Sequence, residues 1–234
     1  MIKRKKFGQH FLKSDHIAKF IVDSLNLKHS DIVYEIGTGR GILLPLLCKK
    51  SKCVITIEKD KSLFKDAFEK FSMFNNLTIM YGDGFKQNEK FDIFVSNLPY
   101  SKSKTAIQWM LMQKFTTGVI MIQYDFAKKL LSTKQDRKAI SVLAQSGFDM
   151  KILRNVSKVN FTPQPKINST IMSFTRKSTF SKELIQSVNL IFSFRRKKIQ
   201  NICKQLGLKI KSDLRLEEMS NDEIIKLARK IRKF

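Results

Sequence analysis

Cysteine is scarce in this chain, and long apolar runs are missing altogether. The three cysteines, Cys48, Cys53 and Cys203, form neither an even disulfide set nor the spacing of a metal site. Their apolar surroundings instead predict buried free thiols, which suits a reducing cytoplasm. No apolar stretch reaches the ~18 residues that span a bilayer, and no apolar segment follows the charged residues 1–6. We therefore expect a cytoplasmic protein without a metal, a disulfide framework or a membrane anchor.

Acidic residues are also few. Asp and Glu number 20 against 45 Lys and Arg, which gives a formal net charge of +25 and a pI of about 10.1. This excess of positive charge favours a polyanionic partner such as a nucleic acid. It can equally come from lysine enrichment spread over a solvated surface, so charge alone does not identify the partner. The 234 residues, 42% of them hydrophobic, suffice for one α/β domain and a small appendage.

Strand and helix patterns alternate between Ser14, a predicted helix N-cap, and residue 176. The predicted strands cover residues 31–36, 53–57, 77–81, 91–96, 119–122 and 171–174. The predicted helices cover residues 41–48, a segment ending at residue 71, and residues 105–112, 126–131 and 139–145. This alternation predicts an α/β fold with a Rossmann-like parallel sheet covered by helices.

Beyond residue 177 the pattern changes to three helices, at residues 184–194, 197–206 and 222–231, without a strand signal. We therefore predict two domains. Residues 1–177 would form the cofactor-binding sheet domain with its N-terminal segment, and residues 178–234 would form a small, basic, helical domain.

A glycine-rich turn follows the first predicted strand. Gly37, Gly39 and Gly41 let the backbone turn tightly and approach a ligand closely. Glu58 ends the second strand, 58 − 37 = 21 residues after Gly37, where an acid can accept both hydroxyls of a ribose. Asp83 ends the third strand, where a carboxylate can accept an adenine amine. Ligands of open parallel sheets bind at such strand ends, so the sequence predicts a nucleoside site.

Two nucleoside cofactors suit this site to different degrees. NAD would place a pyrophosphate at the helix N-terminus and would favour a Gly-x-Gly-x-x-Gly pattern. Here Glu35 precedes the glycines, where it can face an amino group. S-adenosylmethionine has no phosphate and carries an ammonium group, so the sequence favours it. A purely structural acid remains an alternative for Glu58 or Asp83 taken singly.

The most informative stretch is Asn97-Leu98-Pro99-Tyr100, directly after the apolar residues 91–96. The Asn97 amide oxygen and the Leu98 carbonyl can each accept one N–H of an exocyclic amine. Pro99 has a fixed φ that holds this carbonyl in place, and Tyr100 offers a flat face on which a nucleobase can stack. The alternative is a strand that ends in a proline turn with a core tyrosine, and the tetrapeptide alone favours neither.

Four segments follow one another along the chain: Lys6-Phe7-Gly8-Gln9-His10-Phe11-Leu12, Glu35-Ile36-Gly37-Thr38-Gly39, Asn97-Leu98-Pro99-Tyr100 and Phe161-Thr162-Pro163-Gln164-Pro165-Lys166. Together they closely resemble the KsgA/Erm family of ribosomal RNA adenine N6-dimethyltransferases. The resemblance extends to Phe194-Arg195-Arg196-Lys197-Lys198 in the tail. Leu98 resembles the KsgA branch, which modifies small-subunit rRNA, whereas the Erm branch usually has Ile there.

The resemblance implies an S-adenosylmethionine-dependent methyltransferase with a role for each matching residue. Six positions would bind the cofactor: His10, Leu12, Gly37, Glu58, Asp83 and Asn97. The last of these would be shared with the target base, and Phe161 would stack on the target adenine opposite Tyr100. Without the family, Phe161 is interpreted as an ordinary core phenylalanine.

The chain departs from the family pattern in three places. His10 replaces the usual Asn, and we expect cofactor binding to survive because backbone can make the contacts there. We interpret its side chain as core-facing rather than as a catalytic base. Tyr124 and Asp125 stand where many relatives carry Lys-Glu, without an expected loss of activity. The tail is short for the KsgA branch.

The predicted function is methyl transfer to N6 of adenosines in small-subunit ribosomal RNA, by a monomer, in two steps that give N6,N6-dimethyladenosine. RNA docking is assigned to Arg195, Arg196, Lys197 and Lys198, with residues 3–6 and the C-terminal helices. The alternatives are an Erm-like large-subunit enzyme, a DNA adenine methyltransferase, and a non-catalytic ribosome-assembly or nucleic-acid-binding protein. No DNA-recognition domain is evident, and Glu58, Asp83 and Asn97 favour catalysis.

Overall fold

The computed structural model describes residues 8–133 and 136–231. Contacts divide the chain into two compact units, of which the first comprises Met1–Ser103, Lys114–Ala127 and Met150–Thr175. The second comprises Lys104–Gln113, Lys128–Asp149 and Arg176–Phe234. The domain boundary predicted after residue 177 lies close to the last of these divisions. The second unit also takes in two internal segments that the prediction assigned to the first domain.

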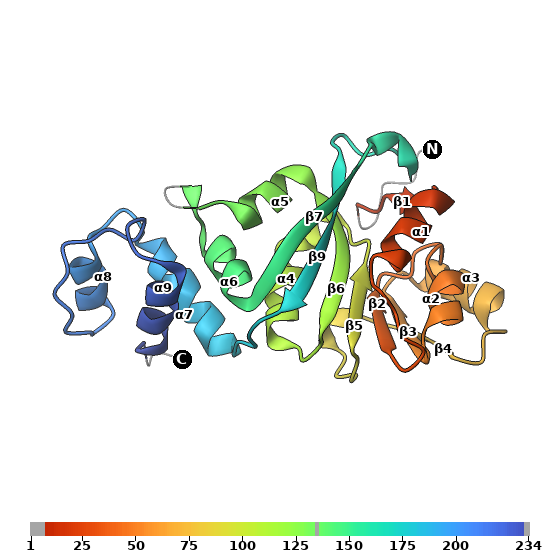
Figure 1. The fold of residues 1–234 in the computed structure, drawn as a ribbon, viewed down its shortest axis with the longest axis horizontal. Coiled ribbons are helices and arrows are strands. Elements are labelled where there is room, and N and C mark those ends of the chain that lie inside the picture. The colour runs from red at the N-terminus through yellow and green to blue at the C-terminus, as the bar shows by residue number, and fades with distance from the viewer. Residues whose placement is uncertain (1–7, 134–135, 232–234) are drawn as a thin grey trace. The chain divides into compact units, whose positions relative to one another are not determined.

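A seven-stranded sheet runs through the first unit in the order β4-β3-β2-β5-β6-β9-β7 (Figure 1). Its strands are β4 (Leu77–Tyr81), β3 (Cys53–Glu58), β2 (Ile32–Ile36), β5 (Ile93–Ser96), β6 (Thr117–Gln123), β9 (Ser169–Arg176) and β7 (Phe148–Val156). The five strands from β4 to β6 pair in parallel, whereas β9 is antiparallel to β6. The predicted α/β fold is confirmed. The prediction of a parallel sheet is wrong for β9.

The order of the parallel strands reverses at β2. Strands β3 and β4 extend the sheet on one side of β2, and β5 and β6 extend it on the other. Connections leave neighbouring strands in opposite directions at such a reversal, so a crevice opens at the carboxyl ends of β2 and β5. The carboxyl ends of β2, β3, β4 and β5, which lead to Gly37, Glu58, Asp83 and Asn97, therefore meet along one edge of this sheet.

Three helices share an apolar core with this sheet: α1 (Asp15–Asp23), α2 (Leu44–Lys50) and α3 (Lys61–Phe71) (Figure 1). The predicted cap of α1 is confirmed, because Ser14 Oγ accepts a hydrogen bond from the Ile17 N–H at 3.4 Å. Helix α2 begins three residues later than predicted, since Gly41 has a φ of +71°. A Cβ at Gly41 would lie 2.2 Å from the Phe71 ring, so only glycine allows this turn to pack on α3.

Three strands were not predicted. Strand β7 occupies an edge and exposes charged side chains, so it lacks the alternation that marks a half-buried strand. Strands β1 (Phe11–Leu12) and β8 (Phe161–Thr162) have two residues each, too few for any periodic pattern. They pair antiparallel, with Leu12 opposite Phe161, and so join two motif segments that are far apart in the sequence.

The second unit is helical. It contains most of α4 (Ser103–Met112), together with α6 (Ala139–Gly147), α7 (Lys182–Ser193), α8 (Ile199–Gln205) and α9 (Asn221–Arg229). The three predicted C-terminal helices are confirmed. Arg137, only 8% exposed, donates hydrogen bonds to Asn221 Oδ1 and to the carbonyls of Leu216 and Met219. This buried guanidinium therefore fixes the segment that precedes α9.

The remaining elements are short or cross the division between the units. They are α5 (Tyr124–Leu131) and the 3₁₀ turns η1 (Gly84–Lys86), η2 (Tyr100–Lys102) and η4 (Lys158–Asn160). Cys48 and Cys203 are buried free thiols as predicted, whereas Cys53, at the first position of β3, is half-buried. Within residues 8–133 and 136–231, no helix has the length and apolar character needed to cross a membrane.

Candidate active site

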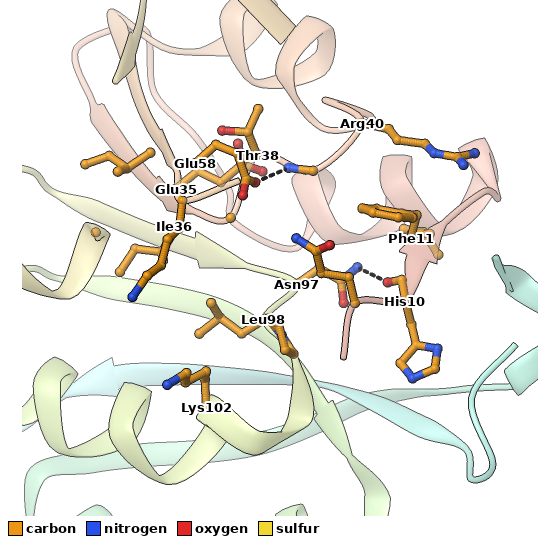
Figure 2. Close-up of a pocket in the computed structure, with 18 of the residues that line it drawn as sticks. His10, Phe11, Glu35, Ile36, Thr38, Arg40, Glu58, Asn97, Leu98 and Lys102 are labelled. Carbon is orange, nitrogen blue, oxygen red and sulfur yellow. Dashed lines mark hydrogen bonds between the residues drawn. The ribbon is translucent and has the colours of Figure 1, made fainter. Parts of the chain in front are cut away.

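A cavity of about 360 Å³ opens at the carboxyl ends of the central strands, a size typical of small-molecule sites. Its walls come from residues 8–12, 35–40, 42–43, 57–59, 82–85, 97–99 and 101–102 (Figure 2). All six predicted cofactor residues line it: His10, Leu12, Gly37, Glu58, Asp83 and Asn97. The fold thus brings together side chains that are spread over 88 residues of sequence, from residue 10 to residue 97.

Glu58 is a buried carboxylate held by the backbone. Its Oε2 accepts the Gly39 N–H and its Oε1 accepts the Asp60 N–H, both at 2.8 Å, and the side chain is 3% exposed. Figure 2 shows the bond to Gly39. A carboxylate oxygen has two lone pairs, so each oxygen of Glu58 can accept one more donor. The pair of hydroxyls on a ribose matches that capacity.

The glycine turn offers little to a pyrophosphate. The Gly39 N–H points to Glu58, and the Gly37 N–H donates to the Ile57 carbonyl at 2.8 Å. Both amides are therefore engaged within the protein, and acidic side chains line the same wall. Gly37 itself has a φ of +84°, a conformation that favours glycine. The geometry suits a ligand that carries positive rather than negative charge near this turn.

Glu35 lies at the floor of the cavity at 2% exposure. Thr56 Oγ1 donates a hydrogen bond to Glu35 Oε2 at 2.6 Å, and Thr38 Oγ1 lies 2.6 Å from Thr56 Oγ1. Burial raises the pKa of Glu35 to about 8, against the opposing effect of the Thr56 bond and with a further increase from the charge of Glu58. A cationic group bound nearby would favour the ionised form.

Asp83 is charged and anchored. Burial by itself would raise its pKa, but Lys59 Nζ at 2.9 Å and the Phe85 N–H at 3.2 Å outweigh burial, so the pKa lies below its usual value. The sequence reasoning missed Lys59, which lines the cavity directly after Glu58. A lysine in so lysine-rich a chain carries no signal of its own.

Asn97 follows directly after β5 and points into the cavity (Figure 2). Its Nδ2 donates to the His10 carbonyl at 3.5 Å, which leaves Oδ1 as the acceptor on the opposite side of the amide. Leu98 and Pro99 also line the cavity, and Pro99 has a φ of −53°. A Cβ on Gly37 would lie 3.8 Å from Leu98 Cδ2, so the tetrapeptide adjoins the glycine turn.

The Tyr100 ring does not line the cavity, because His10 lies against it. The two rings stack with centroids 5.6 Å apart and an interplanar angle of 23°. The Tyr100 hydroxyl and Ser169 Oγ share a hydrogen bond, and burial raises the pKa of Tyr100 although that bond opposes the rise. The core-facing interpretation of His10 is wrong: the residue is half-buried, lines the cavity and covers Tyr100.

Phe161 is not available for the predicted stacking on a base in this structure. Its side chain is 2% exposed and belongs to the apolar core that includes Leu12, its partner across the β1–β8 pair. The ordinary core interpretation describes it better. Two-residue strands leave no periodic pattern, so the pairing of Phe161 with Leu12 could not be predicted.

The predicted RNA-docking residues, Arg195, Arg196, Lys197 and Lys198, are all exposed in the second unit. Two of them, Arg195 and Arg196, line a cavity of about 370 Å³ together with three further cations, Arg137, Lys138 and Arg215. Lys198 pairs with Asp213 at 2.9 Å. Arg137 and Arg215 were missed because neither belongs to a basic run such as residues 195–198. The predicted contacts at residues 3–6 lie outside the described residues.

Comparison with known proteins agrees with this geometry. The model of the family described as ribosomal RNA adenine dimethylase matches residues 2–231. A protein named ribosomal RNA small subunit methyltransferase A from Thermotoga neapolitana is 33% identical, over 96% of this chain and 90% of its own length.

Two solved structures share the fold. One is a dimethyladenosine transferase from Plasmodium falciparum, with a TM-score of 0.79 and 24% identity over 93% of this chain and 96% of that one. The other is the 23S rRNA methyltransferase ErmE, with a TM-score of 0.68 and 20% identity over 94% and 99%. At these identities the two structures support the fold alone.

Proposed function

Because the chain belongs to the ribosomal RNA adenine dimethylase family, we propose that it methylates N6 of adenosines in small-subunit ribosomal RNA. The methyl donor would be S-adenosylmethionine and the product N6,N6-dimethyladenosine. One observation carries the proposal. Asn97, Leu98 and Pro99 lie on the rim of the same cavity that Glu35, Glu58 and Asp83 line. The names of the relatives support the choice of the small subunit.

The residues of the cavity fit S-adenosylmethionine. Glu58 would accept the ribose hydroxyls, Asp83 would accept the adenine amine, and the buried carboxyl of Glu35 would face the positively charged end. The engaged amides of Gly37 and Gly39 support this cofactor over a dinucleotide. When bound, S-adenosylmethionine supplies an electrophilic methyl group on a positively charged sulfur.

The protein's own task is to hold and orient the target amine. Asn97 Oδ1 and the Leu98 carbonyl would each accept one N–H of adenine N6, while Pro99 fixes the position of that carbonyl. Two acceptors favour a pyramidal nitrogen whose lone pair points toward the methyl group. Positive charge that develops on the nitrogen is then stabilised by dipoles already in place.

Positioning alone accounts for much of the rate. Orientation of two reactants can supply roughly 7–11 kcal/mol of the barrier, so a dedicated general base is unnecessary. After the first transfer the nitrogen releases one proton to solvent and keeps one N–H, so one of the two acceptors still anchors the amine for the second. The target adenine must leave its stack to reach the cavity.

The substrate would dock on the basic second unit. Arg195 and Arg196, with the neighbouring Arg215, offer charge-assisted contacts to phosphates. A wide basic surface suits a folded ribonucleoprotein better than a short hairpin, so the proposed substrate is a partly assembled small subunit. The cytoplasmic location and the monomeric state stay predictions.

A transfer assay tests the proposal. The purified protein is incubated with labelled S-adenosylmethionine and, separately, with undermethylated small subunits, large-subunit rRNA and duplex DNA, and the products are identified by mass spectrometry. We expect dimethyladenosine chiefly in the small subunit.

The other outcomes separate the alternatives. Label chiefly in large-subunit rRNA would indicate an Erm-like enzyme, and label chiefly in DNA would overturn the RNA assignment. Absence of transfer to all three, despite measurable binding of the small subunit, would indicate a non-catalytic binding protein.

A further inference from the structure

Residue 10 contacts Asn97, the proposed acceptor of the target amine, and Tyr100, the residue expected to stack on the target base. The His10 ring stacks on Tyr100 with centroids 5.6 Å apart, and the His10 carbonyl accepts the Asn97 Nδ2–H at 3.5 Å. A third contact orients the ring. Nδ1 lies 2.6 Å from the Pro163 carbonyl, and since a carbonyl only accepts, Nδ1 carries the proton and donates.

A base that stacks on the face of Tyr100 next to His10 must pass between these two rings. Two rings that sandwich a base stand about 7 Å apart, twice the ~3.5 Å contact distance between carbon atoms. The centroids of His10 and Tyr100 are 5.6 Å apart, so the rings must separate by at least about 1.5 Å to admit a base. Adenine therefore enters by replacing a ring–ring contact with two ring–base contacts.

Phe161, the aromatic residue that was expected opposite Tyr100, lies in the core at 2% exposure. His10 is half-buried, lines the cavity and already lies parallel to Tyr100. Its imidazole provides an aromatic face for stacking, which the small amide of an Asn at this position would lack. His10, which directly precedes β1, thus supplies an accessible second ring beside Tyr100, whereas Phe161 of β8 does not.

We propose that His10 and Tyr100 form a two-ring clamp, defined by these two residues, that holds the target adenine by stacking on both faces. This inference rests on the proposed function, since it concerns the base on which the reaction occurs. His10 is a substrate-stacking residue in this view and exchanges no proton with the amine.

Opening of the clamp is linked to Asn97. The 3.5 Å bond between Asn97 and the His10 carbonyl is at the long limit for a hydrogen bond, so it breaks with little cost. Gly8, two residues before His10, has a φ of +63° and no atom within 4 Å of where its Cβ would stand. A shift of residue 10 about this glycine would free the Asn97 amide and the Tyr100 face in one step.

The test measures methyl transfer to undermethylated small subunits by wild type, His10→Ala and His10→Phe. Base–aromatic stacking implies that His10→Ala lowers kcat/KM about 5- to 150-fold. His10→Phe keeps a ring without the Pro163 bond and should recover most of the loss. His29→Ala, a change at an exposed histidine remote from the cavity residues, is the matched control and should behave as wild type.

Two readouts separate stacking from a structural effect. Calorimetry of S-adenosylmethionine binding should give the same affinity for wild type and His10→Ala. In a double-mutant cycle, His10→Ala should cost less in a Tyr100→Ala background than in wild type, because the clamp is already broken. Circular dichroism and thermal unfolding check that each variant is folded.

Several results would overturn the clamp. For His10→Ala, these are an unchanged kcat/KM or a lower KM. The others are an equal loss of kcat/KM in His10→Ala and His10→Phe, and losses of kcat/KM that add when His10→Ala is combined with Tyr100→Ala. A lower KM would mean that His10 obstructs the base. If wild type itself transferred no methyl group to any RNA, the proposed function would fail, and the clamp with it.

Discussion

Glu58 is held by two backbone N–H groups at 2.8 Å, whereas Asn97 is joined to the His10 carbonyl at 3.5 Å. Glu58 belongs to what we call the cofactor half of the site, namely Glu35, Gly37, Glu58 and Asp83. Asn97 belongs to the base half, namely His10, Asn97 and Tyr100. Short hydrogen bonds hold the acids of the first half, and Glu35 and Glu58 are also deeply buried, while long or ring-to-ring contacts join the second half.

The difference matches the two ligands. A small cofactor always presents the same groups, so a rigid arrangement of acids binds it without reorganisation. A base within a large RNA arrives only after extrusion from its stack, and the residues that receive it must first separate. Changes in the two halves should therefore affect different measured quantities.

The largest expected effect is in the base half. Asn97→Ala should lower kcat by ~10²–10³, because a positioned acceptor of the reacting amine is lost. Asn97→Asp keeps an acceptor oxygen and should retain more activity than Asn97→Ala. Turnover with undermethylated small subunits at saturating cofactor gives the answer. Near-wild-type turnover of Asn97→Ala would contradict the proposed role of Asn97. It would also contradict the proposed difference between the cofactor half and the base half of the site.

The next effect is in the cofactor half. Glu58→Ala removes a charged acceptor, and hydrogen bonds to charged groups are worth ~1.5–3 kcal/mol, so S-adenosylmethionine affinity should fall ~10- to 150-fold. Titration calorimetry measures it, with exposed Glu69→Ala on α3 as the matched control. Unchanged affinity would reduce Glu58 to a structural acid that only supports the Gly39 turn.

Changes in the predicted RNA-docking residues should have a smaller effect, and they should leave the cofactor half and the base half unaffected. Replacing Arg195 and Arg196 with Gln should weaken binding of the small subunit and leave cofactor affinity unchanged. The slope of log affinity against log salt concentration should become shallower by about 1.4. Each of the two lost arginine contacts to a single-stranded phosphate accounts for ~0.7 of this change. The double variant Lys61→Gln, Lys65→Gln controls for net charge, since both lysines are exposed on α3. Equal slopes for the two double variants would make Arg195 and Arg196 ordinary solvated surface.

The last prediction concerns the pH dependence of stability, which is measured on a different scale from turnover and binding. The pKa of Glu35 is raised from 4.5 to about 8, so the folded state retains a proton that the unfolded state has lost between these values. The contribution of this group to the free energy of unfolding is full below pH 4.5 and decreases as the pH rises to about 8.

Glu35→Gln cannot ionise, so its stability relative to wild type should increase over this range and then level off. Urea unfolding of both proteins at pH 5, 6.5, 8 and 9 measures the difference. A constant difference would mean that Glu35 is ionised in the folded protein across the whole range.

Local sequence patterns predicted the elements that carry the cofactor half. Residues 31–36, 53–57 and 77–81 were expected to form strands, and β2, β3 and β4 match them within one residue at each end. Buried parallel strands appear as continuous apolar runs, and an acid or glycine at the end of each run is visible without knowledge of its neighbours. Glu58 and Asp83 were identified in this way.

The base half was predicted only in part. The tetrapeptide from Asn97 to Tyr100 was found, but the stacking of His10 on Tyr100 was not, because His10 is placed by the pairing of the adjacent β1 with β8 and by its bond to Pro163 after β8. These strands have two residues each and are defined by pairing across about 150 residues, so no local pattern marks them. The stacking of His10 on Tyr100 and the burial of Phe161 both depend on that pairing.

The sequence by itself determined the α/β fold, the glycine turn, the acids at the strand ends and the family. These depend on periodicity and on residue types at fixed spacing, which are properties of short segments. The tertiary structure decided which side chains are accessible: Phe161 is covered, His10 lies over Tyr100, and β9 is antiparallel to β6. The physical reason is that burial and ring contacts arise between segments distant in the chain, whose approach only the packed core fixes.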